Sequence, residues 1–147
     1  MSTKTKIDFA RKTIKRFIQN DYARLWTKHS KETPDRFADD GVYFNSSRFP
    51  EITPGLHKTK KSVPTKIQTL NAFLQRVSPS SQSILDAQIF KTSNFNTNVF
   101  GNYAVVLFDL VIGLKLENAK MVTVEMIVAQ TLILTHNGWR IVNEDVS

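Results

Sequence analysis

Residues 137–147, NGWRIVNEDVS, combine a tight-turn signal, a tryptophan and polar residues at positions where a buried strand would continue. Asn-Gly is a strong hairpin signal because both residues tolerate the positive φ that a type I′ turn needs. The long β-rich run 121–136 comes directly before it. The two segments are therefore predicted to pair as a hairpin whose turn is centred on Asn137 and Gly138.

This turn position predicts which side chains share one face of the sheet. Trp139 would lie opposite His136, Ile141 opposite Leu134 and Asp145 opposite Gln130. Unpartnered polar groups cost about 1–3 kcal/mol each when buried, so we expect the polar members of this face either to bond one another or to line a pocket that holds water or a ligand. The full face is Trp139, Ile141, Asn143, Asp145, Gln130, Leu134, Leu132 and Val128. The alternative is that Asp145 and Gln130 lie at a frayed end of the sheet.

The preceding strand, 103–116, has two possible registers. A tight turn near Asn118 and Ala119 would place Asp109 on the concave side and an apolar row on the convex side, which would favour a dimer through the sheet. A bulge would instead turn Asp109 to solvent and bury the apolar row. That row is Val106, Phe108, Leu110 and Ile112.

The N-terminal half has helical periodicity. Ile7, Ala10, Ile14, Phe17 and Ile18 form the apolar stripe of an amphipathic helix over residues 5–19. A break at Asn20-Asp21 precedes a second helical segment with Tyr22, Leu25 and Trp26. A strand at 41–45, a loop at 46–55, and a helix after Pro64 that ends at 78–81 follow. A strand at 83–91 and a polar hairpin or bulge at 94–98 then lead into the long strands. This order predicts an α+β domain with helices on one face of a curved antiparallel sheet.

Composition limits the function classes. The chain of 147 residues, 41% of them hydrophobic, fits a single domain spanning 1–147. It has no cysteine and only three well-separated histidines, so we expect no disulfide, no metal site and no cofactor. Charges interrupt every apolar stretch, so we expect a cytoplasmic protein without a membrane segment. The net charge of +7 is interpreted as solvated helix faces, because few aromatic residues accompany the basic clusters and no nucleic-acid surface is expected.

The segment RFADDGVYF at 36–44, together with NGWRIVNEDVS and the order of helices and strands, resembles the NTF2-like superfamily. The resemblance covers nearly the whole chain and is nearest to the SnoaL-like and ketosteroid-isomerase-like branches. It implies a cone of helices and curved sheet that encloses a pocket. The same fold serves isomerases, dehydratases, cyclases, transport adaptors and oligomerisation modules, so it does not settle function.

The resemblance to ketosteroid isomerases fails at the residues that carry their chemistry. The position of the carboxylate base is Asn45, and an amide cannot abstract a proton at neutral pH. The oxyanion-donating tyrosine would fall near Phe17, which has no hydroxyl, and the protonated carboxylic acid near Gln130. We therefore expect no isomerase activity of that type.

The SnoaL-like resemblance implies an Asp or His that lines the cone and acts as an acid or base without a cofactor. The candidates are Asp145 and Asp109, with His57 at the loop mouth. The expected ligand is a small apolar molecule, and the expected assembly is a homodimer through the sheet. The remaining pocket residues would be Tyr22, Tyr43, Asn45, Gln130, Trp139, Ile141 and Asn143. The alternative is a non-catalytic partner-binding or association module, which a cone filled by its own side chains would favour.

Overall fold

The computed structural model describes residues 2–50, 55–77 and 83–147 of the chain. Helix α1 (Thr3–Phe17) begins where the Ser2 side chain accepts a hydrogen bond from Thr5 N at 3.2 Å. Ile14 and Phe17 are buried, as the apolar stripe predicts. Within the described residues, no helix combines the length and apolar character needed to cross a membrane.

The predicted break at Asn20 and Asp21 is wrong. The chain stays helical from α1 through the wide π turn η1 (Ile18–Tyr22) and the 3₁₀ turn η2 (Ala23–Trp26), and a turn at 27–29 then leads to the 3₁₀ turn η3 (Ser30–Arg36). Because the path continues without a break, Tyr22 and Trp26 enter the core beneath the sheet, where both side chains are fully buried.

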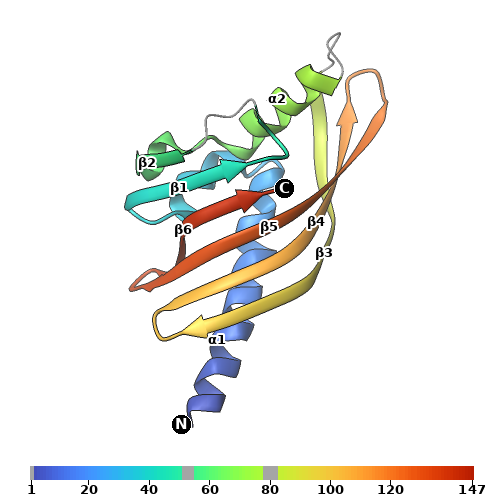
Figure 1. Cartoon of the computed structure of the whole chain (residues 1–147). Helices are drawn as coiled ribbons and strands as arrows, with labels where there is room; N and C mark the ends of the chain where they lie inside the picture. Colours follow the sequence, from blue (N-terminus) through green and yellow to red (C-terminus); the bar gives the residue numbers. More distant parts are fainter. Residues whose placement is uncertain (1, 51–54, 78–82) are drawn as a thin grey trace.

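Six strands form one curved sheet in the order β2-β1-β6-β5-β4-β3 (Figure 1). The strands are β1 (Asp40–Ser46), β2 (Gly55–Thr59), β3 (Ile84–Phe100), β4 (Tyr103–Leu116), β5 (Met121–Thr135) and β6 (Gly138–Val146). Neighbouring strands are antiparallel except β1 and β6, which are parallel. Strand β2 was not predicted, and β3 continues past the predicted end at residue 91. The polar stretch at 94–98 lies within β3 beside a register shift, with Asn94 at φ +57°.

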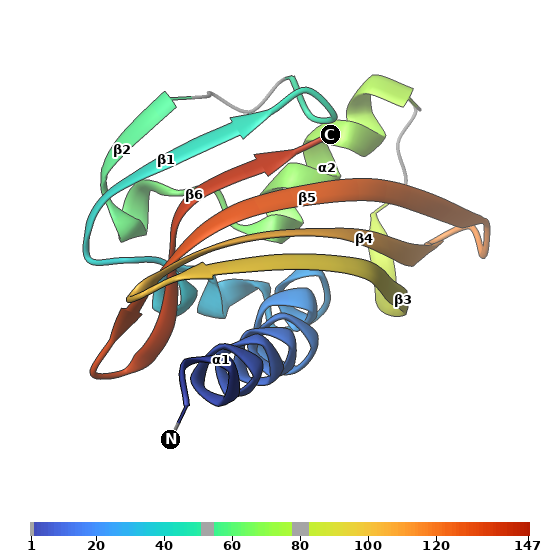
Figure 2. The same cartoon turned by 60° about the horizontal axis from the view of Figure 1, so that its bottom comes forward.

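Helix α1 and the following helical turns lie against the concave face of the sheet (Figure 2). Helix α2 (Lys66–Val77), preceded by the short turn η4 (Lys60–Ser62), covers the β1–β6 end. The α+β class and the helix-on-sheet arrangement are confirmed. Residues 51–54 of the predicted loop and the predicted end of α2 at 78–81 lie outside the described residues.

The β4–β5 turn decides the position of Asp109. Leu116 N donates to Lys120 O and Ala119 N to Leu116 O, both at 2.9 Å, and Ala119 has φ +63°. These contacts define a three-residue loop that ends in a left-handed residue. Asp109 consequently pairs with Ile127 and faces outward. The register that placed Asp109 in the cone is wrong. The apolar row at 106–112 is buried. The three-residue turn causes this, and the β4–β5 pairing contains no bulge.

The β5–β6 turn also differs from the prediction. Its turn residues are His136 and Asn137, and Gly138 takes a positive φ of +100°, so Leu134 rather than His136 pairs with Trp139. Strand β6 then has one extra residue, Val142, because Ile141 pairs with Leu132 and Asn143 with Thr131. The bulge reverses the alternation of faces. Trp139 and Ile141 face inward before it, and Glu144 and Val146 face inward after it.

Candidate functional site

A buried polar cluster lies inside the cone, between the concave face and the helical segments. Its members are Tyr22, Trp26, Lys66, Gln130 and Glu144, none of them more than 2% exposed. They come from η1, η2, α2, β5 and β6, so the complete fold is needed to bring them together. Tyr22 and Gln130 are predicted pocket residues, whereas the other three are not.

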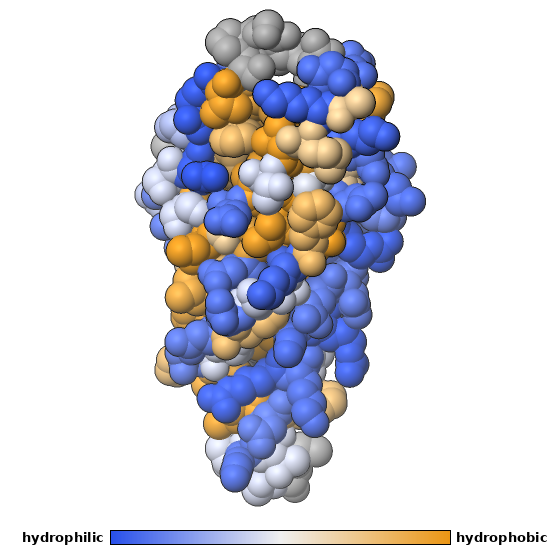
Figure 3. Space-filling model, turned by 90° about the vertical axis from the view of Figure 1, so that its right-hand side faces the viewer, coloured by the Kyte–Doolittle hydropathy of each residue, from blue (hydrophilic) through white to orange (hydrophobic). Residues whose placement is uncertain are grey.

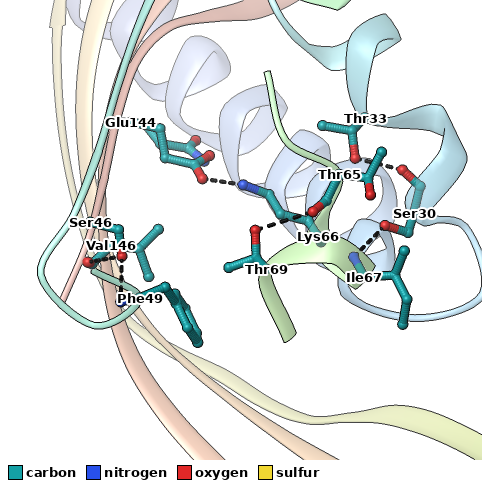
Figure 4. A network of polar contacts seen from close by, with 11 residues as sticks. Ser30, Thr33, Ser46, Phe49, Thr65, Lys66, Ile67, Thr69, Glu144 and Val146 are labelled. Carbon is teal, nitrogen blue, oxygen red and sulfur yellow. Dashed lines mark hydrogen bonds and ion pairs between the residues drawn. The ribbon is translucent and has the colours of Figure 1, made fainter. Parts of the chain in front are cut away.

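Lys66 and Glu144 form an ion pair at the centre of this cluster (Figure 4). Lys66 Nζ reaches Glu144 Oε1, and Gln130 Nε2 donates to Glu144 Oε2 at 3.1 Å. Ile67 N, one residue beyond Lys66, donates to Ser30 Oγ at 2.7 Å, which fixes the start of α2 against η3. The lysine is thereby directed into the cone and not toward solvent.

Four aromatic rings surround the Lys66 ammonium. The ring centroids of Tyr22, Trp26, Phe37 and Phe44 lie 5.4, 5.0, 5.6 and 5.2 Å from Nζ. A cation within about 6 Å of an aromatic face is attracted by the ring quadrupole, and the attraction is strongest when water is excluded. The ammonium and its rings therefore occupy the centre of the cone.

Three polar atoms of the cluster have no hydrogen-bond partner among the described residues. They are Tyr22 Oη, Trp26 Nε1 and Gln130 Oε1. Burial raises the pKa of Tyr22 well above its ordinary value, and the nearby Glu144 carboxylate raises it further. Tyr22 is therefore a neutral hydroxyl that can donate a hydrogen bond.

The two predicted catalytic residues face away from this cluster. Asp145 is exposed beside the outward-facing Ala129, and Asp109 Oδ2 accepts a bond from Asn94 Nδ2 at 2.6 Å on the convex face. The expectation that either carboxylate lines the cone is wrong for these positions. The Asp145 side chain faces outward because of the bulge at Val142. The Asp109 side chain faces outward because of the β4–β5 loop.

Asn143, Tyr43 and Asn45 also lie outside the cone. Tyr43 pairs with Asn143 and Asn45 with Asp145 across the parallel β1–β6 ladder, and all four side chains are exposed on the convex side. The strand at 41–45 was predicted correctly, but Val42 and Phe44 are its buried residues.

Trp139, Ile141 and His57 lie elsewhere. Ile141 is part of the core. Trp139 is 4% exposed and lines a separate groove beside α1. His57 lies on β2, within hydrogen-bond distance of Ser62 Oγ (3.1 Å) and edge-on to Phe44. The predicted pocket is thus divided among the cluster, the core, the groove and the convex face.

Sequence reasoning missed Lys66 and Glu144. A signal for Lys66 exists, because it lies four residues before Leu70 on the buried stripe of α2. Glu144 gives no comparable signal, because its inward orientation depends on the bulge.

The cone also defines the class of fold. No family model matches the sequence, and no curated protein matches it. Solved structures do match. An NTF2-like superfamily protein from Salmonella enterica superposes with a TM-score of 0.62 at 17% identity, over 95% of this chain and 91% of that one.

Two further structures represent different functions on the same fold. A hexachlorocyclohexane dehydrochlorinase matches with a TM-score of 0.59 at 13% identity, covering 95% of this chain and 88% of that one. The association domain of CaMKII from C. elegans matches with a TM-score of 0.63 at 14% identity, covering 97% and 98%. The chain has the NTF2-like fold. Among solved structures that fold includes an enzyme and an association domain.

Proposed function

We propose that this chain is a non-catalytic association module that forms a homodimer through the convex face of its sheet. The convex face comprises the outward side chains of β4 and β5 and the exposed β6 residues beside them. Its apolar centre is Tyr103, Val105, Leu107 and Ile127, which are 50%, 44%, 43% and 49% exposed. This exposed apolar surface on adjacent paired strands is the observation that carries the proposal.

Monomeric proteins rarely leave a large contiguous apolar surface in water. The four residues come from directly neighbouring strands, and the half-buried Ala129 and Ile133 lie opposite Leu107 and Tyr103. Figure 3, viewed from the β3 edge of the sheet, shows hydrophobic patches separated by strongly hydrophilic surface. A partner that covered the apolar centre would remove it from water.

A second copy of the chain fits this face. In a two-fold dimer the same surface meets itself, so an apolar centre covers an apolar centre and the polar rim meets the polar rim. The rim contains Asn143 and Asp145 on β6, whereas Asp109 lies within the face, opposite Ile127, with its carboxylate accepting a hydrogen bond from Asn94. An NTF2-like neighbour is itself an association domain, which supports this use of the fold.

The filled cone favours association over catalysis. Lys66 and Glu144 are 0% exposed, and the four rings close around the ammonium. A substrate would have to displace a buried ion pair to reach the cluster. The SnoaL-like assignment and a cytoplasmic location remain predictions.

Sedimentation analysis of the purified protein tests the proposal. We expect wild type to sediment as a dimer at micromolar concentration, and Leu107→Lys to sediment as a monomer because a charge would be buried at the centre of the interface. Val77→Lys is the matched control, because Val77 is 50% exposed at the end of α2, away from the convex face. A wild-type protein that is monomeric throughout, or equal effects of the two substitutions, would overturn the proposal.

A second candidate function is acid–base chemistry on a small molecule in the cone. The unpartnered Tyr22 Oη, Trp26 Nε1 and Gln130 Oε1 favour it, because unpaired buried polar atoms call for a ligand or water. Glu144 and Tyr22 would move the proton in that case. A co-purifying molecule seen by native mass spectrometry, lost in Tyr22→Phe and kept in Tyr43→Phe, would support it. A crystal structure with only water at these atoms would contradict it.

A further inference from the structure

An apolar groove lies beside the first turns of α1, apart from both the buried cluster and the convex face. Its volume is about 440 Å³, which falls in the range of small-molecule pockets. Residues of α1 form one wall, and the ends of β3, β5 and β6 form the other. The lining residues are Thr3, Lys6, Ile7, Phe9, Ala10, Thr13, Val99, Gly101, Asn102, Leu134 and Trp139.

The groove exists because α1 extends beyond the part of the helix that packs on the sheet (Figure 1). Arg11 Nε donates to Thr97 O at 3.2 Å, and Lys15 Nζ lies 5.4 Å from the Phe95 ring, so the middle of α1 is held against β3. Before Arg11 the contacts become sparse. Ile7 and Ala10 are only half-buried, and Phe9 is 66% exposed. Apolar side chains therefore face one another across an unfilled space.

The lining of the groove carries a positive charge and no negative one. Lys6 is the only charged residue in the lining, and no described carboxylate forms an ion pair with it. The nearest acidic residue along α1, Asp8, pairs with Arg11 at 3.8 Å. The chain also carries a net charge of +7, so the surrounding field favours an anion. Six of the lining residues are apolar and would take a hydrocarbon chain: Ile7, Phe9, Ala10, Val99, Leu134 and Trp139.

We propose that this groove binds a free amphiphilic anion, an alkyl carboxylate of medium chain length. The alkyl chain of the ligand lies against Trp139, Leu134 and Phe9, and its carboxylate pairs with Lys6. Each buried methylene raises the affinity about fourfold. Affinity should therefore rise with chain length until the groove is filled. The site does not depend on the convex-face dimer, so the two proposals can fail separately.

Calorimetric titration with dodecanoate below its micelle concentration tests the site. We expect one dodecanoate per chain and at least tenfold weaker binding of dodecyltrimethylammonium, which has the same chain and the opposite charge. Lys6→Glu should weaken dodecanoate binding about tenfold. Lys12→Glu makes the same change of net charge outside the lining, and it should change the affinity by less than twofold.

Fluorescence quenching shows where the alkyl chain of the ligand lies. A bromine-terminated undecanoate should quench the fluorescence of Trp139. It should not quench the fluorescence of Trp26, which is fully buried in the polar cluster. Trp139→Phe should remove the quenching and leave calorimetric binding detectable. Leu107→Lys should bind dodecanoate as wild type does, which separates this test from that of the dimer.

Three results would overturn the proposal. They are equal affinity for the anionic and cationic chains, equal effects of Lys6→Glu and Lys12→Glu, and the absence of saturable binding. Binding to anionic phospholipid vesicles without binding of monomeric dodecanoate would also overturn it, because the basic helix would then recognise a membrane surface and the groove would hold no free ligand.

Discussion

At the residue scale, Lys66 and Glu144 are the side chains whose burial most needs an explanation. Removing both charges from water costs several kcal/mol per ion, and a single ion pair rarely offsets that cost. Here the carboxylate also accepts from Gln130, and four rings surround the ammonium. The two charges are therefore stabilised as a unit, and each depends on the other.

This dependence predicts strong coupling between substitutions. Lys66→Met should lower the free energy of unfolding by about 3–5 kcal/mol, because it leaves Glu144 buried without a cation. Adding Glu144→Gln should recover part of that loss, since the charge is removed while an acceptor for Gln130 remains. Urea unfolding of wild type, both single variants and the double variant measures the coupling. Losses that simply add would show that the pair does not act as a unit.

Tyr22 predicts a change of stability in alkaline solution. Its pKa is raised in the folded protein, so above pH about 10 the unfolded chain loses the phenolic proton while the folded chain keeps it. Below about pH 10, Tyr22 stays protonated in both states, so it should add no pH dependence to the free energy of unfolding. Above it, the loss should approach about 1.4 kcal/mol per pH unit.

Unfolding of wild type and Tyr22→Phe between pH 8 and 11 isolates this contribution, since other groups titrate equally in both proteins. The curve for Tyr22→Phe should fall less steeply above pH about 10. Tyr43→Phe is the control, because Tyr43 is 49% exposed and lies outside the apolar centre of the convex face. Parallel curves for wild type and Tyr22→Phe would contradict the assignment.

At the scale of the elements, two turns and one bulge decide which face each strand presents. The side-chain period of a strand is two, so a pairing register shifted by one residue, as when a loop gains one residue, transfers every side chain to the other face. The β4–β5 loop contains three residues, and this length reverses the predicted faces of β4. The β5–β6 turn begins one residue before the predicted position and keeps the predicted faces, because it still contains two residues. The bulge at Val142 then reverses the faces of Asn143 and Asp145.

Ala119 offers a test of the β4–β5 turn. It has φ +63°, a left-handed conformation that disfavours residues with a Cβ atom. Ala119→Gly should raise the free energy of unfolding by about 0.5–1 kcal/mol, because glycine adopts this conformation without steric cost. Ala87→Gly, within β3, should be destabilising. Thermal unfolding compares the two, and a destabilised Ala119→Gly protein would show that the loop has another conformation.

At the scale of the whole molecule, the sheet separates two environments. The concave face carries the core and the buried cluster, and the convex face carries exposed apolar residues. If the convex face forms a dimer, folding and association are linked, and the melting temperature depends on protein concentration.

The melting temperature of wild type should therefore rise by several degrees between about 1 and 100 μM protein, because mass action favours the dimer. The melting temperature of Leu107→Lys should be independent of concentration. Differential scanning calorimetry measures both. A wild-type melting temperature that does not change with concentration would argue against a dimer linked to folding.

The sequence by itself determined the α+β class, the amphipathic α1, the α2 stripe and the long β4, β5 and β6 strands. These features follow from local periodicity, which composition and spacing encode directly. It also indicated that Tyr22 and Gln130 lie inside the cone, and both are buried there.

Only the tertiary structure decided which acidic residue enters the cone. Glu144, and neither Asp145 nor Asp109, faces inward, because the turns and the extra residue Val142 set the strand registers. Lys66 joins it because the start of α2 is fixed against η3. Register and docking depend on contacts between segments far apart in the chain, which local sequence patterns do not contain.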